Sequence, residues 1–149
     1  LESNQKCNLV FKHHPMDRGH VHYGALIKQI TADLKLSDRV YYIHDQHLPT
    51  LLKDCKGVVT INSTTALQAF YHSAPVMVMG EAFFDMPGLT HQDTLASFWC
   101  EPAAIDNEFA DQFRAYLLDH GQVNGSFYCM TAHTMKNLIV YLRLHGILR

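Results

Sequence analysis

Two short groups of polar residues have the types and the spacing needed to hold a small anion. They are a basic group, Lys12, His13 and His14, and a hydroxyl-rich group, Asn62, Ser63, Thr64 and Thr65. A lysine supplies a point charge, and an imidazole donates a hydrogen bond to a phosphate oxygen. Hydroxyls at the start of a helix add donors beside the unpaired backbone N–H groups and the positive end of the helix dipole. The two groups predict a phosphate or carboxylate site, in which His14 would neutralise charge on a departing group.

Each group also has a simpler interpretation. Ser63 is a common helix N-cap residue, which would be expected at a helix start without any ligand. Consecutive histidines can lie on a solvated loop in a chain that has 11 of them. The pairs His20/His22 and His44/His47 have spacings that metal sites use, but no nearby cysteine completes a ligand set, and we expect no metal. The sequence contains no glycine-rich P-loop, which disfavours an ATPase or kinase of that kind.

Four short apolar runs, rich in β-branched residues, are typical of the strands that would position these groups. They span residues 8–11, 40–43, 57–61 and 76–79. Their few charges predict strands that are buried on both faces, as in parallel sheets. Helical spacing follows between them, at residues 26–34, from Leu48-Pro49 onward, and at residues 66–70. The alternation predicts an α/β domain with right-handed crossovers, a mostly parallel sheet and helices on both faces.

In such a sheet, ligands bind beyond the carboxyl ends of the strands, and all four predicted strands end in polar residues. Residues 44–47 follow the second strand, where we expect Asp45 to cap the helix near Leu48. The fourth strand runs into a loop with Glu81 and Asp85, for which contact with a ribose or sugar hydroxyl and a plain solvated loop are equal alternatives. One polar crevice along these strand ends is the simplest interpretation.

The last third of the chain has a different pattern. Residues 90–99, 106–119 and 131–145 predict helices, and in the last of these Met135, Leu138, Ile139 and Leu142 form one apolar stripe. We expect the aromatic residues of this helical tail to pack in a core rather than to form a stacking platform. No repeat or linker interrupts the chain, so the prediction is one domain over residues 1–149.

The composition excludes several classes of protein. Of the 149 residues, 48% are apolar and 17% are charged, which predicts an ordered globular chain. A formal net charge of −2 gives no overall attraction to nucleic acid or to an anionic membrane. The four cysteines are widely spaced and predict free thiols. The uncharged stretch 57–80 carries too many polar residues for a membrane span, and we expect no signal peptide and a cytoplasmic location.

Three blocks of sequence resemble the capsule polysaccharide biosynthesis and export family. They are residues 12–17 (KHHPMD), residues 62–65 (NSTT) with Ala69 and Pro75-Val76, and residues 80–90 (GEAFFDMPGLT). The likeness runs from about Leu9 to Tyr128. Characterised members are similar to Kdo transferases, which start the glycolipid anchor of bacterial capsules. The resemblance implies a GT-B glycosyltransferase, in which two Rossmann-like halves enclose the active site and a CMP-activated sugar is the donor.

The resemblance also implies roles for the two polar groups. Bacterial sialyltransferases, which use CMP-sugars as well, are similar in having a His-Pro motif and a Ser-Ser or Ser-Thr motif at the CMP phosphate. His14-Pro15 corresponds to the first motif and Ser63-Thr64 to the second. His14 would then be the catalytic residue that assists the departure of CMP. The expected nucleotide-binding residues are Lys12, His13, His14, Asn62, Ser63, Thr64, Thr65, Glu81 and Asp85, with no cofactor, because the CMP-sugar is itself the substrate.

The family pattern includes an amino-terminal half, which would supply acceptor binding and a general base, whereas this sequence starts just before the strand that leads into Lys12. We therefore expect a carboxy-terminal, donor-binding half that binds nucleotide weakly and transfers nothing alone. Its expected partners are CMP-Kdo, the amino-terminal domain and a glycolipid acceptor, without nucleic acid; peripheral contact with the inner face of the inner membrane is left open. The alternatives are a UDP-sugar transferase or epimerase, and a non-catalytic module that binds a phosphorylated ligand or a protein.

Overall fold

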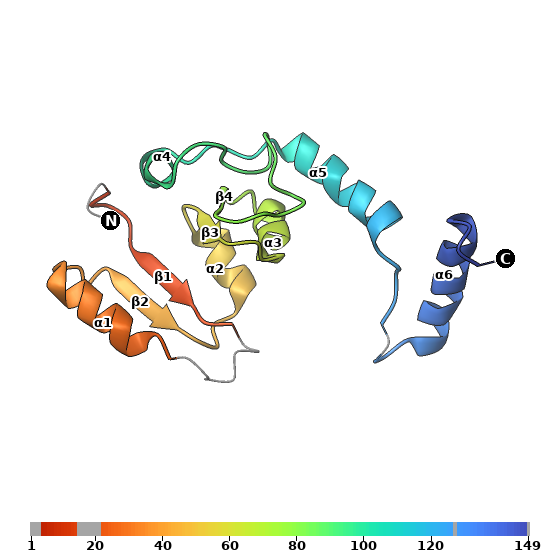
Figure 1. Cartoon of the computed structure of the whole chain (residues 1–149), viewed down its shortest axis with the longest axis horizontal. Helices are drawn as coiled ribbons and strands as arrows, with labels where there is room; N and C mark the ends of the chain where they lie inside the picture. Colours follow the sequence, from red (N-terminus) through yellow and green to blue (C-terminus); the bar gives the residue numbers. More distant parts are fainter. Residues whose placement is uncertain (1–3, 15–21, 127, 149) are drawn as a thin grey trace. The chain divides into compact units, whose positions relative to one another are not determined.

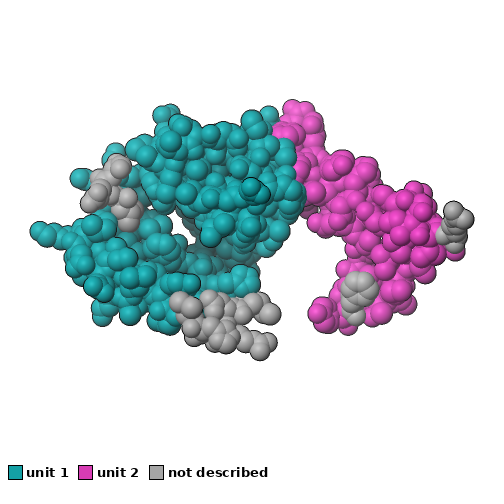
Figure 2. Space-filling model, in the orientation of Figure 1, with its two compact units in different colours: residues 1–106 teal, residues 107–149 magenta. Residues whose placement is uncertain are grey.

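The computed structural model describes residues 4–14, 22–126 and 128–148 of the chain. They belong to two compact units, residues 1–106 and 107–149, which Figure 2 shows in teal and magenta. The first unit carries all the strands of the described chain, and the second is helical. The single domain over residues 1–149 stays a prediction.

The first parallel strand pair of unit 1 brings two strand ends together. It consists of β1 (Leu9–Lys12), α1 (Gly24–Asp33) and β2 (Val40–Ile43). The register runs from Leu9 opposite Val40 to Lys12 opposite Ile43, and α1 makes the crossover that a parallel pair requires (Figure 1). The His13 N–H donates to the Ile43 carbonyl at 2.8 Å, which extends the pairing by one residue. The carboxyl ends of β1 and β2 therefore lie side by side.

The second parallel pair has the same construction. It follows α2 (Leu48–Asp54) and consists of β3 (Val58–Thr60), α3 (Thr65–Tyr71) and β4 (Val76–Val78). Two further backbone bonds extend it, from Met79 N–H to the Thr60 carbonyl at 2.8 Å and from Gly80 N–H to the Ile61 carbonyl at 2.9 Å. The loop after β4 therefore starts beside the loop after β3.

The core of unit 1 gathers around β4, whose three residues are all buried. Ala66, Ala69 and Phe70 of α3 pack there, and Phe84 and Leu89 of the following loop are almost fully enclosed. Phe98 of α4 (Leu95–Cys100) closes the core from another segment. A Cβ on Gly57 would lie 2.6 Å from the Phe98 ring, so the ring occupies the space that a side chain at position 57 would need. Apolar burial around β4 is the main stabilising term of this unit.

The structure differs from the expected sheet in two respects. The four strands form two separate parallel pairs within the described residues, where the sequence predicted one mostly parallel sheet. Only β4 is buried along its whole length, whereas Val10, Tyr41 and Val59 are exposed. Successive side chains of a strand point to opposite faces, so strands that are covered on one face alternate between buried and exposed positions. The α/β class with short parallel strands is confirmed, and the Rossmann-like half remains a proposal.

Unit 2 confirms the helical tail. It contains α5 (Asn107–Tyr116), a π-helical turn η1 (Leu117–Gly121) and α6 (Thr131–Leu144). The Thr134 hydroxyl is buried and bridges the ends of the preceding loop, since it accepts from Ser126 N–H at 2.7 Å and donates to the Met130 carbonyl at 2.9 Å. No helix of the described chain is long and apolar enough to cross a membrane.

The four cysteines are free thiols, as their spacing predicted. Cys55 follows α2 and is half-buried, and its Sγ donates to the Leu52 carbonyl at 3.3 Å. Burial raises the pKa of the Cys55 thiol, because the charged thiolate is poorly solvated there. Cys100 and Cys129 are exposed.

Candidate functional site

The ammonium group of Lys12 lies between the ends of β1 and β2. Its Nζ donates to the His44 carbonyl at 3.2 Å and to the His13 carbonyl at 3.4 Å. Lys12 is the last residue of β1 and pairs with Ile43, so the next residue of β2 comes within reach of its side chain. The sequence predicted a positive charge at this strand end, and the structure anchors it to both strands.

His13 is held by a tyrosine of the neighbouring strand. Its Nδ1 lies 2.5 Å from the Tyr42 hydroxyl, and the two rings meet edge to face with centroids 5.8 Å apart. The His13 ring also lies 4.7 Å from the ring of His44. His14 is exposed, while Pro15, Met16 and Asp17 of the same block lie outside the described residues. The structure therefore orients the first histidine of the basic group and leaves the second at the surface.

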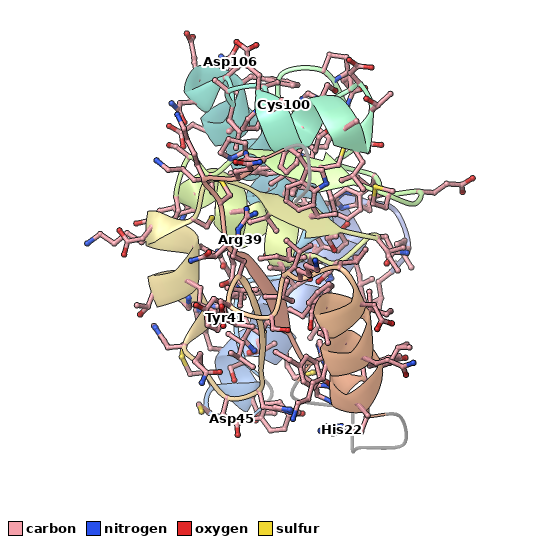
Figure 3. All side chains as sticks on the ribbon, turned by 90° about the vertical axis from the view of Figure 1, so that its left-hand side faces the viewer. His22, Arg39, Tyr41, Asp45, Cys100 and Asp106 are labelled. Atoms are coloured by element: carbon pink, nitrogen blue, oxygen red, sulfur yellow. The ribbon has the colours of Figure 1, made fainter. Side chains whose placement is uncertain are left out.

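A third imidazole joins this end of the sheet from the turn before α1. The His22 ring stacks on His44 at 5.8 Å and meets Tyr42 edge to face at 5.6 Å. We call the rings of His13, His22, Tyr42 and His44 the histidine cluster. A Cβ on Gly24 would lie 2.5 Å from Cε1 of His22, so the glycine leaves the space that this ring fills. Figure 3 shows His22 and Asp45 toward one end of the view and Arg39, which precedes β2, away from it.

The sequence did not point to Tyr42 or His44 as anion-site residues, and it pointed to His22 only as the end of the basic stretch 12–22 and as half of a metal pair. His44 was noted only as a residue after a strand and as half of a metal pair. A parallel pairing of residues 9–12 with residues 40–43 would have placed it beside Lys12, but the sequence alone does not specify that register. No group of three or more metal-ligating residues with the geometry of a metal site occurs in the described chain, and His20 lies outside it.

A cavity of about 350 Å³ borders the basic group. Its lining combines the polar side chains of Lys12, His13, His14 and Tyr42 with Phe11 of β1 and with Tyr23, Leu26, Ile27 and Ile30 at or near α1. A cavity with apolar and basic lining suits a ligand that joins a planar or apolar part to an anionic group. The sequence predicted the basic residues but not the cavity beside α1.

The hydroxyl-rich group forms the start of α3. The Ser63 hydroxyl accepts from the Thr65 N–H at 3.2 Å and donates to the Thr65 hydroxyl at 3.0 Å. The Ser63 N–H donates in turn to the Thr60 hydroxyl at 3.1 Å. The N-cap residue of α3 is Thr64, which makes no side-chain cap hydrogen bond, so the expected N-cap at Ser63 is wrong by one residue. Asn62, Ser63 and Thr64 are exposed. Anion binding by this group stays a prediction.

The loop after β4 carries the two expected carboxylates in different settings. Asp85 Oδ1 accepts from the Thr90 hydroxyl at 2.6 Å and from Gln92 Nε2 at 3.1 Å, which ties the two ends of the loop together. Glu81 is exposed. Asp85 is thus hydrogen-bonded within its own loop. Contacts of either carboxylate with a nucleotide remain a prediction.

His91 is a buried histidine that the sequence reasoning did not single out. Its Nδ1 accepts from the Ala103 N–H at 3.1 Å, which leaves the ring proton on Nε2 to be donated to the Ser97 hydroxyl at 2.8 Å. The Ser97 hydroxyl in turn donates a hydrogen bond to the Thr94 carbonyl at 2.8 Å. This chain of bonds makes His91 a structural residue of the loop before α4. Hydrogen-bond partners, rather than sequence spacing, identify it.

The structure brings the candidate residues together in two sets. Lys12 and His13 lie with the end of β2, and Asn62 follows the end of β3 beside Gly80 and the loop after β4. Because the two strand pairs are not joined into one hydrogen-bonded sheet in the described residues, the single phosphate site made of both sets stays a prediction. The expected cap by Asp45 is wrong, since the N-cap of α2 is His47, whose Nδ1 lies 3.0 Å from the Thr50 hydroxyl.

These features define an α/β chain whose polar side chains gather at the carboxyl ends of short parallel strands. The chain belongs to the capsule polysaccharide biosynthesis protein family, whose model matches residues 1–128. This confirms the resemblance found in the sequence.

Two kinds of curated relative are similar to the chain. It is 45% identical over 131 residues to the capsule polysaccharide modification protein LipB of Neisseria meningitidis serogroup A, an alignment that covers 87% of this chain and 31% of the relative. It is 47% identical over 120 residues to the capsule polysaccharide export protein KpsS of Escherichia coli, with 80% of this chain and 31% of the relative covered. The chain therefore spans about a third of the length of these relatives. No solved structure matches it.

Proposed function

We propose that this chain is the donor-binding part of a capsule glycosyltransferase that transfers Kdo from CMP-Kdo to a glycolipid acceptor. Family membership and the printed names of the relatives support a role in making, modifying or exporting capsule polysaccharide. The observation that carries the proposal is Lys12 at the joined ends of β1 and β2, beside a cavity with apolar and basic lining. A nucleotide-sugar combines the phosphate and the planar base that such a cavity suits.

The proposed chemistry assigns different tasks to the residues of the basic group. When the bond between the anomeric carbon and the phosphate oxygen breaks, its electron pair stays with CMP and adds negative charge to the phosphate. Lys12 stabilises that charge electrostatically, and His14 donates a hydrogen bond or a proton to the departing phosphate. The acceptor hydroxyl forms the new bond to the anomeric carbon and gives its proton to a general base, which the proposal places in the amino-terminal domain.

The hydroxyl-rich group and the carboxylates have supporting places in this proposal. Ser63 and Thr64 would donate to a phosphate oxygen, and Glu81 with Asp85 would accept from ribose or sugar hydroxyls. The side-by-side start of the loops after β3 and β4 supports a shared ligand for these residues. The complete enzyme would work at the inner face of the cytoplasmic membrane, where a glycolipid acceptor lies.

Calorimetric titration of the chain with CMP, and with UMP for comparison, tests the donor. We expect CMP to bind more tightly than UMP, and His14→Ala to weaken CMP binding by about tenfold, the loss of one charge-assisted hydrogen bond. His133→Ala, an exposed histidine of α6, is the control and should bind CMP normally.

The other outcomes separate the alternatives. Preference for UMP would favour a UDP-sugar transferase or epimerase, and absence of binding by a folded chain would favour a non-catalytic module. A transfer assay with CMP-Kdo and a glycolipid acceptor should show no turnover by these 149 residues alone. Turnover would contradict the assignment of the general base to another domain.

A further inference from the structure

We infer that His22 and His44 are phosphate-binding residues that complete the basic group at the end of the β1–β2 pair. This inference rests on the proposed donor site, which it extends by two residues that the sequence motifs do not include. The ligand chemistry is a phosphate group, carried by a nucleotide.

His44 lies against the groups already assigned to phosphate, and His22 lies against His44. His44 lies 4.7 Å from the ring of His13, and its carbonyl accepts from the Lys12 ammonium. The His22 ring stacks on that of His44 with an angle of 19° between the ring planes. Tyr42 meets all three imidazoles edge to face, with centroid distances between 4.8 and 5.8 Å. One short stretch of strand end thus collects one ammonium and three imidazoles.

The ring nitrogens of His22 and His44 have no hydrogen-bond partner among the residues that the structure describes, where both rings take part in ring contacts only. Neither they nor Lys12 form an ion pair in that part of the chain, although Asp45 follows His44 directly. His91 shows the contrast, since both of its ring nitrogens are used within the protein. A set of polar nitrogens beside an uncompensated ammonium is the arrangement that binds an anion.

Gly24 leaves the space that the His22 ring occupies in the histidine cluster. A Cβ at position 24 would lie 2.5 Å from Cε1 and 3.1 Å from Nδ1 of His22, and 3.5 Å from Cδ1 of Tyr42. The first residue of α1 therefore leaves space for the imidazole to lie against Tyr42 and His44. An alanine there would push the His22 ring away without entering the backbone of another strand, because the closest atoms belong to a side-chain end.

The neighbouring cavity, which His13 and Tyr42 of the histidine cluster line and His22 and His44 do not, favours a nucleotide over inorganic phosphate. Phe11, Leu26, Ile27 and Ile30 contribute apolar lining, and Lys12 and His13 contribute polar lining. Inorganic phosphate would use only the polar lining, whereas a nucleotide would place its base or ribose against the apolar lining as well. CMP should therefore bind more tightly than inorganic phosphate at the same rings.

NMR spectroscopy of the imidazole signals tests the inference on the unmodified chain. Inorganic phosphate and CMP should each shift the ring signals of His22 and His44 in a saturable way, with CMP saturating at lower concentration. The signals of His145, which stacks on Tyr141 at 4.1 Å in unit 2, should not move. Ring signals of His22 and His44 that stay in place at saturating CMP would overturn the inference while leaving the proposed function intact.

Variants give a second, independent reading. His22→Ala and His44→Ala should each weaken CMP binding by about tenfold, and Gly24→Ala by about threefold, because it displaces the His22 ring without removing it. His145→Ala is the matched control, since it removes a stacked histidine elsewhere and should leave the affinity unchanged. Normal affinity in both cluster variants, folded by circular dichroism, would overturn the inference.

The two proposals fail in different ways. If phosphate shifts the rings of His22 and His44 but CMP binds no more tightly than phosphate, the anion site stands and the nucleotide donor is wrong. If His14→Ala weakens CMP binding and the cluster variants do not, the donor stands and the additional residues are wrong. If neither compound binds the folded chain, both proposals are wrong.

Discussion

The hydroxyl of Tyr42 lies 2.5 Å from Nδ1 of His13, so a residue within β2 orients the imidazole that directly follows β1. The bond joins two residues that are 29 positions apart in the chain. Since His13 lines the cavity, the parallel pairing of β1 with β2 is a condition for the geometry of the candidate site.

Replacing Tyr42 by phenylalanine should loosen His13 while keeping the ring contacts of the histidine cluster. We expect Tyr42→Phe to reduce the free energy of unfolding by about 1 kcal/mol, the usual net value of one hydrogen bond, and to weaken CMP binding several-fold. Urea denaturation and calorimetric titration measure the two effects. The control is Tyr41→Phe, which removes an exposed hydroxyl that donates to the Asp38 carbonyl at 3.0 Å. Equal effects of both variants on CMP binding would contradict the role of Tyr42.

His91→Ala should destabilise unit 1, because it leaves the Ala103 N–H without its acceptor and opens space beside Phe98. The expected loss is about 2–4 kcal/mol from the unsatisfied donor together with the lost packing. Chemical denaturation followed by tryptophan fluorescence provides the measurement, since Trp99 is adjacent to Phe98 in α4. His47→Ala, at an exposed N-cap, should cost less than about 1 kcal/mol. A His91 variant as stable as the His47 variant would show that the buried bonds contribute little.

Gly57→Ala should disturb the core, because the new Cβ would lie 2.6 Å from Cζ of Phe98 and the ring would have to move. We expect a loss of about 1–3 kcal/mol in the free energy of unfolding, as for other overpacked cores. At Gly121 an added Cβ would meet only Leu117 Cδ2, at 3.6 Å, so Gly121→Ala is the matched control and should be neutral or slightly stabilising. Thermal unfolding of the two variants compares them directly, and equal melting temperatures would refute the packing argument.

Cys55 should react with thiol reagents more slowly than Cys100 near neutral pH. Burial raises the pKa of the Cys55 thiol, so its reactive thiolate forms at higher pH than that of an ordinary cysteine. Labelling with iodoacetamide at a series of pH values, followed by mass spectrometry, gives the rate for each cysteine. The folded state disfavours the Cys55 thiolate. Ionisation of Cys55 therefore leaves the free energy of unfolding unchanged at low pH and lowers it as the pH rises above the pKa that this thiol has in the unfolded chain. A labelling profile of Cys55 that coincides with that of exposed Cys100 would contradict this environment.

The local patterns of the sequence predicted most of the secondary structure. The expected strand at residues 40–43 is β2, and the other three runs agree with β1, β3 and β4 to within two residues at either end. Apolar β-branched runs and Pro49 in the first turn of α2 are local signals, so they act before any tertiary contact forms. The helix expected over residues 90–99 begins only at Leu95, because Thr94 accepts from the Ser97 N–H and caps it there.

What the sequence could not predict depends on contacts between distant segments. The separation of the strands into two pairs depends on which strands become neighbours. Strands of three or four residues carry little sequence information about their partners. The same holds for the histidine cluster, since His22 and His44 meet only when α1 and β2 are placed beside β1. The basic group was found because its residues are consecutive, whereas the residues that surround it are scattered along the chain.

The ammonium group of Lys12 donates a hydrogen bond to the His44 carbonyl, while the backbone of Lys12 pairs with that of Ile43. One residue therefore joins two strands and also carries the charge that the proposed site would offer to an anion. By mass action, an anion bound at this position would stabilise the paired ends of β1 and β2. Loss of this pairing would in turn lower the affinity for the anion. Amide hydrogen exchange at the last residues of β1 and β2 would then slow down when the anion is bound. The exchange rate of these backbone amides would therefore report the fraction of sites that are occupied.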